Sequence, residues 1–169
     1  MRKLIILKSL IDFIWIIPCI PIILAITFIS VYMFIEPSIL EGLLKINDAN
    51  IINNGGFIKI GLLLLFTIVL IVIYCFYLFR KTLRYFRKRN PFNNFIIESY
   101  KKIGNLLIIS GITATILFFI FKLLIESKFE INLGFSPYLF ITCLGLFFLV
   151  LSEVFKIAKT AKQENDLTI

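Results

Sequence analysis

Four long stretches of this sequence contain no charged residue, and each is long enough to cross a lipid bilayer as a helix. They are Phe13–Ile35, Ile60–Phe79, Ile103–Phe121 and Ile131–Ser152. A helix needs about 20 mostly apolar residues to span the hydrocarbon core. The chain is 60% hydrophobic and only 17% charged, so a chain of 169 residues cannot bury its apolar surface from water. The sequence therefore predicts an all-α fold, an integral membrane four-helix bundle that forms a single domain.

The spans and the first loop can be placed from breakers and charges. We expect spans at about residues 11–35, 60–79, 103–125 and 135–155. The first should bend near Pro18 and Pro21, since proline in a membrane helix frees backbone carbonyls that neighbouring groups can satisfy. The segment between the first two spans ends in Asn53-Asn54-Gly55-Gly56, which is typical of a turn. An interfacial helix around Ile39–Ile46 would fit before that turn.

The basic residues divide unevenly between the two sides of these spans. Most of the 18 Lys and Arg lie at the N-terminus, between the second and third spans, or after the fourth span. Cytoplasmic segments of membrane proteins carry an excess of Lys and Arg. We therefore expect both termini and residues 80–102 on the cytoplasmic side of a bacterial inner membrane. Anionic lipid would attract these charges, and we favour this reading over direct binding of nucleic acid.

The basic segment between the second and third spans is predicted to be a helical hairpin. No breaker interrupts Ile60–Arg89, so the second helix should run on past the membrane. Asn90 and Pro91 suit the N-cap and the first position of the next helix. The fourth helix should overrun in the same way, into a cytoplasmic tail at residues 156–169. Its last residues, QENDLTI, would fold back on the hairpin, dock a partner or act as a degradation signal.

Three charged residues lie within or near the predicted spans, where a charge is costly and often functional: Asp12, Lys122 and Glu153. Asp12 and Glu153 lie toward the cytoplasmic ends of their helices, within reach of arginines such as Arg80. Lys122 lies toward the outside, four residues before Glu126, and can pair with it or extend to the interface. We favour interfacial ion pairing for all three over a proton or substrate path.

The chain has no histidine, which argues against most acid–base, nucleophile and zinc chemistry. We expect no catalytic, cofactor-binding or metal-binding residues, and so a protein that is not an enzyme. Three cysteines, each alone in a different span, are expected to be buried and inert: Cys19, Cys75 and Cys143. Small residues that would let helices approach closely, in the chain or in a homo-oligomer, are Gly104, Gly111 and Ala114.

Two motifs carry a resemblance to a known family. The chain has NPFNN and YKKIGNLLI after a basic second helix, and it ends on ENDLTI. In these motifs, and over essentially its whole length, it resembles the four-helix bacterial membrane family catalogued as domain of unknown function 2975. Members are commonly encoded beside a short helix-turn-helix regulator of the Cro/CI type. The resemblance thus implies a membrane partner that holds or releases a DNA-binding protein.

The leading hypothesis is a sensor or anchor that docks such a regulator on its cytoplasmic surface. The residues expected to form that surface are Arg80, Lys81, Arg84, Arg87, Pro91, Phe92, Glu164, Asp166, Leu167, Thr168 and Ile169. The alternative is an immunity or small-molecule transport protein, which the kinked first helix and the three charged residues of the spans would suit. A membrane enzyme comes third, with only the pair Asp12 and Glu153 in its favour.

Overall fold

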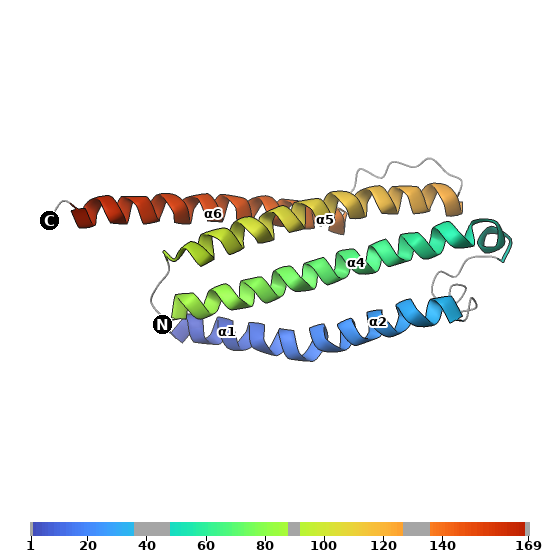
Figure 1. Cartoon of the computed structure of the whole chain (residues 1–169), viewed down its shortest axis with the longest axis horizontal. Coiled ribbons are helices and arrows are strands. Elements are labelled where there is room, and N and C mark those ends of the chain that lie inside the picture. The colour runs from blue at the N-terminus through green and yellow to red at the C-terminus, as the bar shows by residue number, and fades with distance from the viewer. Residues whose placement is uncertain (1, 36–47, 88–91, 127–135, 168–169) are drawn as a thin grey trace.

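The computed structural model describes residues 2–35, 48–87, 92–126 and 136–167, and this part of the chain is all-helical. The elements in order are α1 (Arg2–Ile14), the π-helix η1 (Trp15–Cys19), α2 (Ile20–Ile35), α4 (Asp48–Arg87), α5 (Asn94–Glu126) and α6 (Pro137–Leu167) (Figure 1). Within this part, four helices are long and apolar enough to cross a membrane: Ile6–Ile35, Gly56–Phe86, Asn94–Leu123 and Pro137–Asp166. The all-α class and the four candidate spans are therefore confirmed.

The first candidate span consists of α1, η1 and α2. Pro18 lies inside η1, the single π-helical segment of the described chain. Proline lacks the N–H that an α-helix requires and its ring meets the preceding turn. A local π-turn is one way to accommodate it within a continuous helix. The helix changes direction between α1 and α2 (Figure 1), which confirms the bend predicted near the prolines.

Helix α4 is the longest element, with 40 residues. At 1.5 Å per residue the path along its axis is about 60 Å, roughly twice the thickness of a hydrocarbon core. It includes residues 53–56, so the turn predicted at Asn53-Asn54-Gly55-Gly56 is wrong. Two glycines disfavour a helix by about 1 kcal/mol each. Elongation of an existing helix is cooperative, and the long apolar helix that follows offsets that cost. The interfacial helix predicted around Ile39–Ile46 lies outside the described residues.

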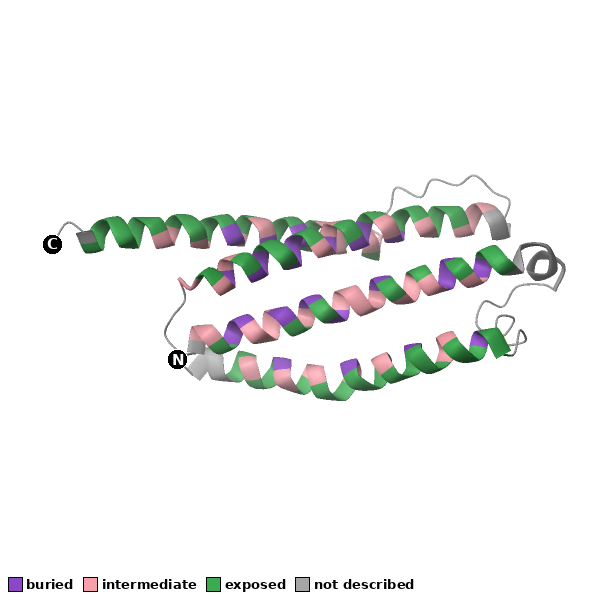
Figure 2. Ribbon diagram, in the orientation of Figure 1, coloured by how far each residue is buried: buried purple, intermediate pink, exposed green. Residues whose placement is uncertain are grey.

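The helices pack in sequence order. Helices α1 and α2 lie on α4, α4 packs on α5, and α5 makes the most extensive contact with α6. Buried residues line the facing sides of the helices and exposed ones the outer sides (Figure 2). A core cluster joins three helices and consists of Cys75, Leu78, Ile96, Tyr100, Ile103, Leu107 and Phe148. Large apolar side chains such as Phe28 and Phe140 are more than 60% exposed, as expected of side chains that face lipid.

Close contact between α5 and α6 depends on glycine. A Cβ atom at Gly104 would lie 2.8 Å from the backbone oxygen of Gly145, and one at Gly145 would lie 2.9 Å from the backbone oxygen of Gly104. Farther along, Gly111 lies against the backbone of Tyr138 and Thr142. Small residues allow two membrane helices to approach this closely. The role expected of Gly104 and Gly111 is confirmed.

The start of α5 differs from the prediction. Asn93 is the N-cap, since its side-chain oxygen accepts a hydrogen bond of 2.9 Å from the N–H of Phe95 and its carbonyl accepts one of 3.0 Å from Ile96. The predicted cap, Asn90, lies three residues earlier and outside the described residues, as does Pro91. Both asparagines suit an N-cap by residue type, and the cap forms at the one that directly precedes the helix.

Candidate functional site: the basic end of the helices

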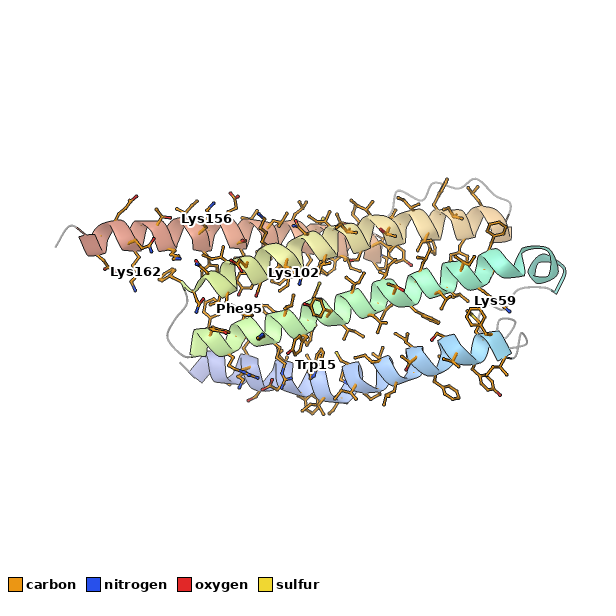
Figure 3. The ribbon with its side chains drawn as sticks, viewed as in Figure 1. Trp15, Lys59, Phe95, Lys102, Lys156 and Lys162 are labelled. Atoms are coloured by element: carbon orange, nitrogen blue, oxygen red, sulfur yellow. The ribbon has the colours of Figure 1, made fainter. Side chains whose placement is uncertain are left out.

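One end of the helix array carries most of the described positive charge. The start of α1, the end of α4, the start of α5 and the end of α6 lie at this end (Figure 1). We call it the basic end; its described cations are Lys8, Arg80, Lys81, Arg84, Lys101, Lys102, Lys156, Lys159 and Lys162. The described cations of the opposite end are Lys59 and Lys122, and Figure 3 shows Lys59 far from Lys156 and Lys162. The predicted grouping of basic segments at one end is thus present.

Arg80 joins the first helix to α4. Its guanidinium donates a hydrogen bond to Asp12, whose other carboxylate oxygen lies 3.8 Å from the Nζ atom of Lys8. The same guanidinium lies 6.0 Å from the ring centroid of Trp15, which packs at 5.3 Å against Tyr77. Asp12 therefore has the arginine partner that its position predicted. A charge held in this way stabilises the fold, and it leaves Arg80 less available to a docking partner.

Other basic side chains near the end of α4 and the start of α5 lie over aromatic rings. Lys81 lies 4.8 Å from the ring centroid of Phe95, which stacks at 4.7 Å on Tyr85. Lys102 donates a hydrogen bond of 3.3 Å to the Tyr74 hydroxyl. These contacts join α4 to α5 by cation–π and aromatic packing. Lys81, like Arg80, thus contributes to helix packing. The contact of Arg80 with Asp12 was predicted from the sequence, whereas that of Lys81 with Phe95 was not.

Of the remaining residues predicted on the hairpin, Arg84 is exposed. The side chain of Arg87 and all of Pro91 lie outside the described residues. Phe92 is half-buried, with Lys162 of α6 5.8 Å from its ring centroid. Among the cations of the predicted set whose side chains the structure describes, Arg84 is exposed, whereas Arg80 and Lys81 are half-buried.

The end of α6 extends beyond the other helices at the basic end (Figure 1). Lys159 donates a hydrogen bond to the Asn94 side chain, which holds this extension against the start of α5. The helix continues to Leu167, so QENDL forms the last part of α6. Glu164 and Asp166 are exposed on its last turns. The Leu167 side chain, Thr168 and Ile169 lie outside the described residues.

The charged residues of the spans do not form one site. Asp12 pairs with Arg80 between α1 and α4, whereas Glu153 is exposed on α6 beside α5. Lys122 is half-buried near the opposite end of α5, and the side chain of its predicted partner, Glu126, is outside the described set. The structure therefore provides no carboxylate pair formed by Asp12 and Glu153.

The cysteines agree with the prediction in part. Cys19 and Cys75 are buried and all three thiols are free, but Cys143 is exposed, because it lies on the outer face of α6. In the described part of the chain, no three or more Cys, Asp or Glu residues lie close enough to hold a metal ion.

The roles of several residues at the basic end were not predicted from the sequence. Trp15, Tyr74 and Tyr77 lie at the level where the basic side chains begin, and a belt of Trp and Tyr is a known signal of the membrane interface. That signal was available in the sequence. The contact between Asn94 and Lys159 was not, since it joins residues of two helices far apart in the chain.

The comparisons with known proteins agree with the resemblance seen in the motifs. No curated protein and no solved structure matches the chain. One family model, described as "Protein of unknown function (DUF2975)", matches residues 39–169, which covers α4, α5, α6 and the tail. The first helix precedes the match, so the likeness is less extensive than the motifs indicated. With well over half of its length matched, the chain belongs to the DUF2975 family of proteins of unknown function.

Proposed function

We propose that this chain is a non-enzymatic protein of the bacterial inner membrane that docks a small Cro/CI-type helix-turn-helix regulator at its basic end. Positive charge marks the cytoplasmic side of membrane proteins, and it gathers at the end where both termini lie. A regulator of DNA is a cytoplasmic partner, so this orientation is required for the proposal. The partner itself is inferred from the family resemblance.

The observation that carries the proposal is the acidic end of α6. Glu164 and Asp166 lie in the last turns of a helix that extends past its neighbours. Negative charge near a helix C-terminus opposes the helix dipole, at a cost of about 0.3–1 kcal/mol per charge. The helix dipole does not favour these residues, whereas a basic partner would. The DNA-binding surface of a helix-turn-helix protein is such a partner, since it must neutralise phosphates.

Docking of this kind would also control the regulator. An acidic helix end bound to the basic face of the regulator competes with DNA for the same surface. Exposed Arg84 lies at the same end and offers a positive group to acidic residues at the rim of the partner. The membrane protein would hold the regulator away from its operators until a signal releases it.

The test is capture of the partner from gently solubilised membranes by four forms of the chain. They are the full-length protein, a chain that ends at Gln163, the double variant Glu164→Gln with Asp166→Asn, and the control Gln163→Ala. Captured proteins are identified by mass spectrometry. We expect a helix-turn-helix protein with the full-length chain and the control, and strongly reduced capture with the other two.

Equal capture by all four forms would mean that the regulator contacts the hairpin and not the end of α6. Arg84→Gln would then be the variant that tests this contact. Failure of every form to capture a helix-turn-helix protein would refute the docking. So would a regulator that keeps the same operator occupancy when the membrane protein is deleted.

A further inference from the structure

A groove runs between α5 and α6 at the basic end, on the face away from α4. Its volume is about 760 Å³, and it is lined by Ile97, Glu98, Lys101, Asn105, Leu149, Val150, Ser152, Glu153, Val154, Lys156 and Ile157. The opposite side of α6 carries Phe148 and Phe155, which pack toward α4. The groove therefore opens on the outer side of the helix pair, where a membrane-embedded protein meets lipid.

The groove results from the way the two helices cross. They touch at Gly104 and Gly145, and beyond that point they diverge toward the basic end (Figure 1). Buried Ser152 donates a hydrogen bond of 2.8 Å to the backbone oxygen of Ile97, which holds the helices together beneath the groove. Its walls are thus set by contacts within the chain.

The lining combines apolar surface with charges of both signs. Val150, Val154 and Ile157 are 61%, 53% and 67% exposed. The charged residues are two Glu-x-x-Lys pairs, one on each helix: Glu98 with Lys101, and Glu153 with Lys156.

None of these four charged side chains forms an ion pair with another described residue. All four are exposed. The groove therefore presents two ammonium groups and two carboxylates, with no net charge, next to an apolar surface.

We infer that this groove binds a phospholipid whose headgroup is phosphoethanolamine. The lysines would bind the phosphate, and the carboxylates would accept hydrogen bonds from the primary ammonium group. The acyl chains would cover Val150 and Val154. A glycerol headgroup leaves both carboxylates facing a negative lipid, and a choline headgroup has no N–H to donate. This selectivity differs from the general attraction of a basic surface for anionic lipid.

The test is native mass spectrometry of the full chain in detergent with an equal mixture of phosphatidylethanolamine, phosphatidylglycerol and phosphatidylcholine. We expect phosphatidylethanolamine to be retained about tenfold more than either other lipid, since each lost charged hydrogen bond has at least that effect. The double variant Glu98→Gln with Glu153→Gln should lose this preference. Circular dichroism checks that each variant remains helical.

Two neighbouring lysines provide a matched control. Lys101→Gln removes a groove cation and should weaken retention, whereas Lys102→Gln removes one that contacts Tyr74 on another face and should not. Equal retention of the three lipids, or an unchanged preference in the glutamate variant, would overturn the inference. Retention of glycerophosphoethanolamine, which has no acyl chains, to the same extent as phosphatidylethanolamine would also overturn it, because the apolar wall of the groove would then contribute nothing to binding. The groove needs no regulator, so loss of regulator capture leaves this result unaffected.

Discussion

The contact between α5 and α6 gives the sharpest prediction about stability. Replacement of Gly145 by Ala adds a Cβ atom 2.9 Å from the Gly104 carbonyl oxygen and from the Ile108 amide nitrogen. An ordinary contact begins at 3.4 Å, so the backbones must separate by about half an ångström. Such a gap removes a quarter to a half of the dispersion energy of each contact along the crossing.

We therefore expect Gly145→Ala to lower the free energy of unfolding by about 1–3 kcal/mol, as overpacking does elsewhere. The matched control is Gly56→Ala, at a helical position where a Cβ atom meets nothing within 4 Å. Alanine favours a helix over glycine by up to about 1 kcal/mol, so the control should be neutral or stabilising. Unfolding in mixed detergent micelles, followed by circular dichroism, measures both. If Gly145→Ala is as stable as Gly56→Ala, the close approach of the helices is refuted.

Three further contacts can be tested by the same unfolding measurement. The effects of Asp12→Asn and Arg80→Gln on the free energy of unfolding should not be additive, with a coupling of about 0.6–1.7 kcal/mol in a double-mutant cycle. Additive effects would mean that the ion pair contributes nothing to stability. Ser152→Ala removes a buried hydrogen bond to Ile97 and should lower the free energy of unfolding by about 0.5–1.5 kcal/mol. Ser152→Thr keeps the hydroxyl and should lose less stability; an equal loss in both variants would argue against the bond. Asn93→Ala should cost about 1 kcal/mol and Asn93→Asp much less; two equal losses would contradict the N-cap.

Much of the fold follows from the sequence because the bilayer imposes simple rules. The charge-free runs predict the four candidate spans, and Pro18 predicts the irregular turn in the first helix. Local signals were less reliable at helix ends. Asn90 and Asn93 are equally good caps by type, and Gly55-Gly56 is compatible with a helix when a long one follows. Such choices depend on how far a cooperative helix extends.

The site was predictable in charge but not in geometry. The clustering of Lys and Arg indicates one basic end, and the position of Asp12 predicts its arginine partner, but neither shows that Lys81 lies over Phe95. A helix that is apolar on all sides gives no stripe from which its rotation can be read. The groove between α5 and α6 could therefore not be predicted from the sequence, because it brings Glu98 beside residues of α6 that are more than 50 positions away in the chain.

Orientation is the claim on which the docking proposal depends most directly, and cysteine labelling tests it. Replacement of Cys143 by Ser removes the exposed thiol and leaves two buried ones. Single cysteines are then placed at Thr160, which is exposed at the basic end, and at Ser38, in the segment that connects the end of α2 to the start of α4. With a membrane-impermeant maleimide on spheroplasts, we predict labelling of Ser38→Cys at once and of Thr160→Cys only after permeabilisation. Labelling of Thr160→Cys in intact spheroplasts would contradict a cytoplasmic basic end and with it the proposed function.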